Sequence, residues 1–134
     1  MPVIDTEFLF ALSPHNPKHK YALNILEKYM GKLLVPDTVL FEFLIVLRSY
    51  GRSSQDIRDA LKALRKIFSI YSIKEMYTIN THLLIIHIDL MEKYGLPFFD
   101  SLIAASTLII GDEIISDDRD FDKIPDLKRI PLTP

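Results

Sequence analysis

The chain has 134 residues, of which 49% are hydrophobic and 25% charged, and its formal net charge is −2 at pH 7. A chain of this size is expected to form one domain, residues 1–134. It contains no Cys, which excludes disulfide bonds, thiolate metal sites and cysteine nucleophiles. The charge argues against a protein that coats nucleic acid non-specifically, and the apolar runs are too short to span a membrane. We therefore expect a soluble protein of the cytoplasm.

The first half of the chain predicts two short buried strands, each followed by a pair of helices. Gly31 and Gly51 are placed to end helices, and Pro36 is placed to open one. The expected elements are a strand at 2–4, a helix from 6 towards 12, a helix from 21 to 29, a strand at 33–35, a helix at 39–50, and a helix that begins near 53–56 and reaches 67.

The second half repeats this alternation of strands and helices. We expect a strand at 68–73, a helix at 75–94 ended by Gly95, a helix at 99–110 ended by Gly111, a strand at 113–116, an acidic loop at 117–122 and an edge strand at 127–130. Short buried strands that alternate with helices are typical of a parallel sheet covered on both faces. The predicted fold is a three-layer α/β/α sandwich, related to the Rossmann fold, with a short central parallel sheet.

Four acidic residues end or interrupt apolar segments: Asp5, Glu42, Asp100 and Asp118. An isolated carboxylate costs several kcal/mol to take out of water. Asp5 and Asp118 each follow a predicted strand, and ligands of open α/β sheets bind at the carboxyl ends of strands. Glu42 and Asp100 lie near the starts of helices that can face the same rim. If the four converge, a divalent cation would balance their repulsion.

Each of these residues also has a structural explanation. Asp100 and Asp5 could simply cap helices, and Glu42 could reach solvent near its helix start. The acidic loop could be only solvated, and it does not fit a calcium EF-hand, because Lys123 replaces the turn glycine and Arg129 the closing glutamate. The four His residues do not have the spacing of a metal site, and we interpret them as structural or surface residues.

Four segments carry a resemblance to the PIN-domain family, and more narrowly to VapC-type toxins of toxin-antitoxin pairs. The segments are Val3–Leu9, Phe41–Phe43, Tyr94–Ala105 and Ile115–Phe121. They keep the family's order over almost the whole chain. Two mild departures are Ser101, where the family often has Ala, and Glu7, where Asn is common.

The resemblance implies a PIN-like fold and assigns roles to the acidic residues. Asp5, Glu42, Asp100 and Asp118 would form the catalytic pocket. Asp5 and Asp100 would be the direct ligands of Mg²⁺, with Mn²⁺ able to substitute, and Glu42 and Asp118 are further candidate ligands. The supporting positions would be Thr6, Ser116 and Asp120. The family also implies an RNA substrate, a cognate antitoxin and a homodimer.

The resulting hypothesis is a metal-dependent endoribonuclease. A bound divalent cation would supply both the activated water and the charge stabilisation, so no Ser-His-Asp arrangement is required. Arg48 and Arg52 are candidates for contact with RNA phosphates. The alternative is a non-catalytic PIN-fold module that binds RNA or protein. An aspartyl-phosphate phosphatase fits less well, because Glu7 stands where such enzymes commonly have a second Asp.

Overall fold

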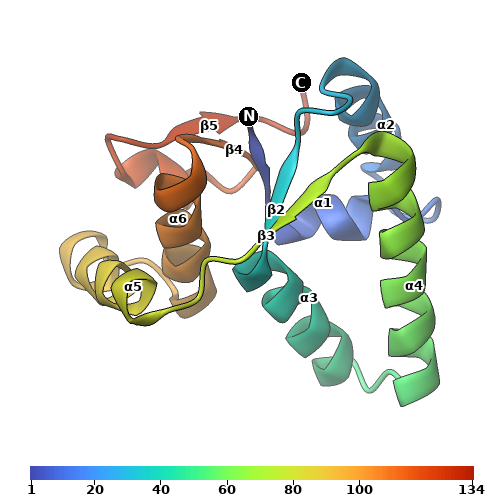
Figure 1. Ribbon diagram of the computed structural model, residues 1–134, viewed down its shortest axis with the longest axis horizontal. Coiled ribbons are helices and arrows are strands. Elements are labelled where there is room, and N and C mark those ends of the chain that lie inside the picture. Colours follow the sequence, from blue (N-terminus) through green and yellow to red (C-terminus); the bar gives the residue numbers. More distant parts are fainter.

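A computed structural model describes residues 1–134 and contains one parallel sheet of five short strands (Figure 1). The strands are β1 (Val3–Ile4), β2 (Leu34–Pro36), β3 (Lys74–Met76), β4 (Glu113–Ile115) and β5 (Lys128–Ile130). Their order across the sheet is β3-β2-β1-β4-β5. The helices are α1 (Thr6–Ala11), α2 (His19–Lys28), α3 (Asp37–Ser49), α4 (Ser54–Tyr71), α5 (Thr81–Tyr94) and α6 (Phe98–Ile110), followed by a 3-10 turn, η1 (Arg119–Lys123).

Helices cover the sheet on both sides, which confirms the predicted three-layer fold. In Figure 1, α1, α2 and α4 lie on one side of the sheet and α5 and α6 on the other, while α3 extends from the carboxyl end of β2. From β1 the chain adds β2 and β3 on one side of the sheet, and after β3 it crosses back to add β4 and β5 on the other side of β1. The strand order therefore reverses at β1. None of the helices combines the length and apolar character needed to cross a membrane.

A buried core of 28 residues joins the layers. Its centre is formed by fully buried residues of the strands and of α1 and α6, which include Ile4, Phe8, Ile103 and Ile114. The small side chains of Ala104 and Ala105 let α6 lie close to its neighbours, as its composition predicts. The core therefore fixes the amino ends of α1 and α6 relative to the sheet.

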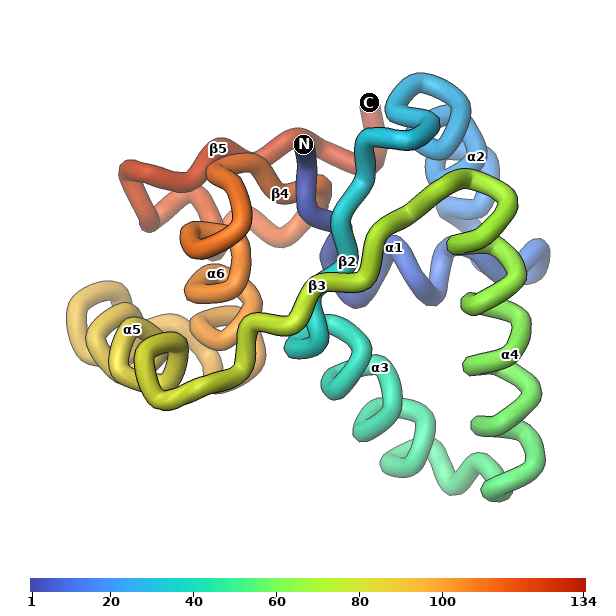
Figure 2. The backbone as a smooth tube through the Cα atoms, viewed as in Figure 1, coloured from blue at the N-terminus to red at the C-terminus, as the bar shows by residue number.

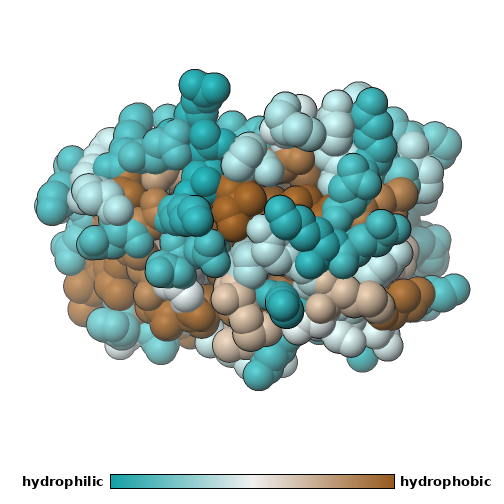
Figure 3. All heavy atoms as spheres, turned by 90° about the horizontal axis from the view of Figure 1, so that it is seen from above, coloured by the Kyte–Doolittle hydropathy of each residue, from teal (hydrophilic) through white to brown (hydrophobic).

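The two chain ends lie together at the end of the sheet opposite to the starts of α1 and α3 (Figure 2). Figure 3 shows the molecule from this side, where mainly hydrophilic residues surround apolar ones that are most extensive on the left, the side of α5 and α6 in Figure 1, and also lie in the centre and on the right. Apolar side chains of α5 that remain exposed are Leu84, Ile85 and Ile88.

The predicted strand at 68–73 is wrong, because α4 continues to Tyr71. Phe68 extends the buried face that Ile57 and Leu64 begin, so the apparent alternation is the end of a helical stripe. The helix ends at Ser72, which adopts φ of 54° without a glycine and donates its N–H to the carbonyls of the last turn. No sequence signal marked this end.

The predicted helix at 75–94 begins too early. Residues 74–76 form the edge strand β3, and α5 starts at Thr81 with Asn80 as its cap, whose Oδ1 accepts a hydrogen bond of 2.9 Å from the N–H of Leu83. β3 is largely exposed and lacks the apolar residues that identify a buried strand. The predicted end at Gly95 is confirmed, with φ of 65°.

A buried polar chain closes the junction between β3, α3 and α6. Asp37 Oδ1 accepts from Thr78 Oγ1 at 2.6 Å and from Thr38 N–H at 3.0 Å, and its Oδ2 accepts from the N–H groups of Thr78 and Ile79 at 2.9 and 3.0 Å. Because the Thr78 hydroxyl donates its proton to Asp37, Thr78 Oγ1 must accept from the Ser106 hydroxyl. Ser106 Oγ must then accept from the Thr38 hydroxyl. The donor and the acceptor of each hydrogen bond between these three hydroxyl groups are thus fixed.

We expect Asp37→Ala to destabilise the fold by about 3 kcal/mol, because four donors lose their acceptor and Thr78 is buried. Urea unfolding of the variant measures the change in the free energy of unfolding. Asp126→Asn is the control, since Asp126 is exposed and is expected to change stability by less than about 0.5 kcal/mol. Equal stability of Asp37→Ala and the parent protein would contradict the assigned role.

Candidate functional site

An acidic pocket of about 300 Å³ lies at the carboxyl end of β1, where the course of the chain across the sheet reverses. It contains all four of the acidic residues singled out in the sequence. The lining residues are Asp5, Thr6, Glu7, Phe10, Glu42, Val46, Asp100 and Asp118. They come from four separate segments: α1 with its N-cap, the middle of α3, the start of α6 and the loop after β4.

Asp5 both caps α1 and faces this pocket. Its Oδ1 accepts a hydrogen bond of 2.7 Å from Thr6 N–H, and its Oδ2 accepts one of 2.6 Å from Ser116 Oγ. Ser116 in turn accepts from the N–H of Asp118 at 3.0 Å. The predicted hydroxyl position at Ser116 thus links the end of β1 to the loop after β4.

Asp100 is not a helix cap, because Pro97 caps α6 and Asp100 lies inside the first turn. That position turns its carboxylate towards the pocket instead of the backbone. Glu42 lies on α3 between the exposed Phe41 and the buried Phe43, and it is half-buried. Both residues therefore line the pocket from helices, at the edge of the sheet where Asp5 and Asp118 lie.

Burial and mutual repulsion perturb two of these carboxylates. Burial raises the pKa of Asp5 to about 7, and hydrogen bonds from Ser116 and Thr6 offset only part of this effect. Burial also raises the pKa of Asp100 to about 7, with repulsion from Asp118, Asp5 and Glu42 acting in the same direction. The pocket is thus a site that takes up protons, or another cation, near neutral pH.

The residues present suit a hard divalent cation. Carboxylate oxygens of Asp100, Asp118 and Asp120 lie within 4.8 Å of one another. Thr6 Oγ1, on the pocket lining, is buried without a hydrogen-bond partner. Oxygen donors of this kind are the ligands that Mg²⁺ and Mn²⁺ prefer. Asp120, predicted only as a supporting residue, lies among the candidate ligands.

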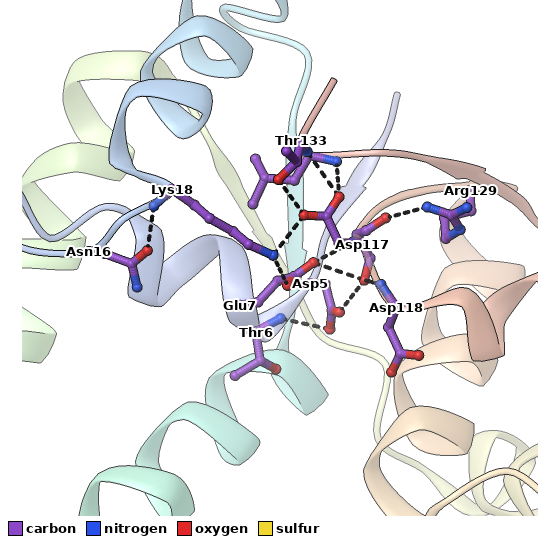
Figure 4. Close-up of polar contacts among 11 residues, drawn as sticks. Asp5, Thr6, Glu7, Asn16, Lys18, Asp117, Asp118, Arg129 and Thr133 are labelled. Atoms are coloured by element: carbon purple, nitrogen blue, oxygen red, sulfur yellow. Dashed lines mark hydrogen bonds and ion pairs between the residues drawn. The ribbon is translucent and has the colours of Figure 1, made fainter.

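Sequence reasoning missed a second group of polar residues, drawn in Figure 4, which adjoins the pocket and shares Glu7 with its lining. Lys18 Nζ lies 2.7 Å from Asp117 Oδ2 and 3.4 Å from Glu7 Oε2. Glu7 Oε1 accepts from Asp117 N–H and, at 3.2 Å, from Ser116 Oγ. The one signal in the sequence is Glu7, which stands where the family commonly has Asn.

Asp117 belongs to this second group and not to the pocket. It accepts hydrogen bonds from the N–H groups of Leu132 and Thr133 and from Thr133 Oγ1. Partial burial alone would raise the pKa of Asp117, but the hydrogen bonds from Lys18 and Thr133 outweigh it and lower the pKa to about 2. The acidic loop is therefore held in place, and is not merely solvated.

The two candidate RNA-binding arginines lie outside the acidic pocket. Arg52 lines a separate, mainly apolar cleft of about 660 Å³ between α1, α3 and α4, and Arg48 is exposed in the last turn of α3. Phe10 lines both hollows, so the cleft adjoins the pocket.

Solved structures of other proteins share this fold. A toxin-antitoxin complex from Klebsiella pneumoniae matches with a TM-score of 0.66 and 20% identity over 95% of each chain. VapBC2 from Rickettsia felis, bound to a DNA fragment from its promoter, matches with a TM-score of 0.70 and 17% identity over 96% of each chain. VapC20 from Mycobacterium tuberculosis, described as a sarcin-ricin loop cleaving toxin, has a TM-score of 0.70 and 16% identity over 91% of this chain and 93% of its own. A search of curated proteins found no match.

Fold and pocket define a small parallel α/β protein with an acidic site at the carboxyl end of its sheet. The family model described as PIN domain matches residues 3–127. The chain therefore belongs to the PIN-domain family, a family of nucleases, as its motifs predicted.

Proposed function

We propose that this protein is a metal-dependent endoribonuclease and the toxin component of a type II toxin-antitoxin system. The observation that carries the proposal is the gathering of Asp5, Glu42, Asp100 and Asp118 in one pocket of a PIN-family chain. Two of these carboxylates have a pKa raised to about 7, which is typical of sites built to hold a cation.

Asp5 and Asp100 are the proposed direct ligands of Mg²⁺ or Mn²⁺, and Glu42 and Asp118 complete the acidic pocket. When bound, the cation would lower the pKa of a water and offset the charge that develops on the phosphate. Ser116 holds the Asp5 carboxylate through its 2.6 Å hydrogen bond and receives the N–H of Asp118. Thr6 offers a buried hydroxyl with no other partner.

RNA is the proposed substrate, in single-stranded segments or loops, where an accessible backbone can approach an open pocket. VapC20, which shares the fold, is described as cleaving the sarcin-ricin loop. The toxin-antitoxin complexes among the structural neighbours support a cognate antitoxin as partner. We further propose a homodimer, which size-exclusion chromatography with light scattering would test.

We expect the purified protein to cleave end-labelled single-stranded RNA when Mg²⁺ or Mn²⁺ is added, and to leave it intact in EDTA. Gel electrophoresis of the products measures cleavage, and a small phosphate monoester serves as the alternative substrate. A non-catalytic binding module would retain RNA in a gel shift without producing fragments. Fragments that form equally well in EDTA would contradict the proposed metal dependence.

A further inference from the structure

Lys18 is the cation that bridges Glu7 and Asp117 beside the acidic pocket, while Arg129 donates to the Ser116 carbonyl of the same loop at 3.1 Å. It lies just before α2, and in Figure 4 its side chain extends across α1 to reach Glu7 and Asp117. The side chains of Lys18, Glu7 and Asp117 are 38%, 30% and 21% exposed, so the bridge is only partly screened by water. Contact with Asp117 raises the pKa of Lys18, which keeps the ammonium charged.

The bridge acts on the loop that follows β4. Glu7 accepts from the backbone N–H of Asp117 and lies 3.2 Å from Ser116 Oγ, so it contacts two consecutive residues of the loop. Asp117 Oδ2, which Lys18 contacts, also accepts from Thr133 Oγ1 at 2.6 Å. Lys18 therefore joins α1, through Glu7, to the loop, through Asp117, and Asp117 in turn holds Thr133 near the C-terminus.

The residues on either side of Asp117, Ser116 and Asp118, are directed towards the pocket. Ser116 donates to Asp5, and Asp118 lines the pocket with its carboxylate, which points away from Lys18 in Figure 4. Without the ammonium, Glu7 and Asp117 would lie side by side as two partly buried anions. Their repulsion would push the loop away from α1.

We propose that Lys18 is a positioning residue for the metal pocket: by bridging Glu7 and Asp117, it sets the loop that carries Ser116 and Asp118. The proposal rests on the proposed function only in that the pocket binds a divalent cation. Lys18 itself contacts none of the candidate ligands Asp5, Asp100, Asp118 or Asp120. Groups that orient metal ligands from the second layer typically account for 10- to 100-fold in metal affinity.

The sign of the effect separates positioning from simple electrostatics. If Lys18 were only a nearby positive charge, its removal would strengthen the binding of a cation by reducing repulsion. If Lys18 positions the loop, its removal weakens cation binding although the site becomes more negative. If Lys18 serves only stability, its removal lowers the melting temperature and leaves the metal affinity unchanged.

The test is calorimetric titration of the full chain with Mn²⁺ at about pH 8. We expect Lys18→Met to raise the dissociation constant roughly tenfold, and Lys18→Arg, which keeps the charge, to restore binding to within about threefold of the parent. Lys20→Met is the matched control, because it removes the same charge from an exposed lysine whose ammonium contacts the Tyr21 ring and no carboxylate. It is expected to leave the dissociation constant within about twofold.

A double-mutant cycle tests whether Lys18 acts through Glu7. In the Glu7→Gln background, Lys18→Met should weaken Mn²⁺ binding less than it does in the parent, because the repulsion that Lys18 relieves is reduced. Thermal melts without metal confirm that each variant is folded, and Lys18→Gln replaces Lys18→Met if that variant is not.

Unchanged or tighter Mn²⁺ binding by Lys18→Met would overturn the positioning role and leave the ribonuclease proposal standing. Weaker binding by Lys18→Met in a protein that cleaves no RNA would support the positioning role and count against the nuclease. A parent protein that binds no Mn²⁺ would overturn both.

Discussion

Asp100→Asn is expected to abolish RNA cleavage, with a loss of roughly a thousandfold or more in rate. Groups one layer outside a metal site already account for 10- to 100-fold, and Asp100 lies inside the pocket, with a carboxylate oxygen among the three that approach within 4.8 Å. The amide keeps the shape of the side chain but removes the negative charge that a divalent cation requires. The measurement is the cleavage rate of labelled RNA at saturating Mn²⁺.

The same variant is expected to be more stable than the parent when no metal is present. At pH 8 the parent must hold Asp100 ionised in a buried position beside Asp118, Asp5 and Glu42, and burial first, then this repulsion, raises its pKa to about 7. Asparagine removes this repulsion, so the melting temperature of the metal-free protein should rise by a few degrees. Loss of activity with a gain in stability is the signature of a functional residue.

Asp126→Asn serves again as the control, because it removes one negative charge from an exposed position outside the pocket. It should cleave RNA at the parent rate and melt at the parent temperature. Asp5→Asn is a second variant with the same expected loss of cleavage, although its hydrogen bonds from Thr6 and Ser116 make its stability harder to interpret. Full activity of both Asp100→Asn and Asp5→Asn would refute the metal-site assignment.

The convergence of the acidic residues could be predicted from the sequence because it follows from a general property of parallel sheets. Strands that run in the same direction bring the residues after them to one edge, and this placed Asp5 and Asp118 together. Helix ends at Gly51 and Gly95 could also be predicted, since both glycines adopt positive φ. These features depend on local chemistry or on topology alone.

The features that escaped prediction depend on tertiary contacts or lack a local signal. β3 is a largely exposed edge strand that pairs with β2, and neither Lys74 nor Glu75 gives the apolar pattern of a buried strand. Lys18 and Asp117 lie 99 positions apart in the sequence, and each taken alone is an ordinary charged residue of a loop. Their pairing is visible only once α1 and β4 have been brought together by the core.

Mn²⁺ is expected to raise the melting temperature of the parent protein by roughly 10 °C at about one hundred times its dissociation constant. Binding to the native state alone stabilises by RT ln(1 + [L]/Kd), which is about 2.7 kcal/mol at that concentration, and a chain of this size gains a few degrees for each kcal/mol. Differential scanning fluorimetry with and without Mn²⁺ measures the shift. Asp100→Asn should lose most of it, whereas Asp126→Asn should keep it.

The stability of the metal-free protein is expected to fall as the pH rises towards 7. In the metal-free protein Asp5 and Asp100 have a pKa raised to about 7, so the native state holds more protons than the unfolded chain between about pH 4 and pH 7. These two groups therefore make the metal-free protein most stable at low pH, and their contribution is lost as the pH rises through 7. Asp117, with its pKa lowered to about 2, acts oppositely and only below about pH 4.

Because protons and Mn²⁺ compete for the same carboxylates, the Mn²⁺-induced shift should be small at about pH 5.5 and large at about pH 8. Over the same range the melting temperature without metal should fall, so the two curves diverge as the pH rises. In Asp100→Asn both trends should weaken, since one of the two titrating groups is absent. Two parallel curves in the parent protein would mean that the proton-binding carboxylates are not the ones that hold the metal.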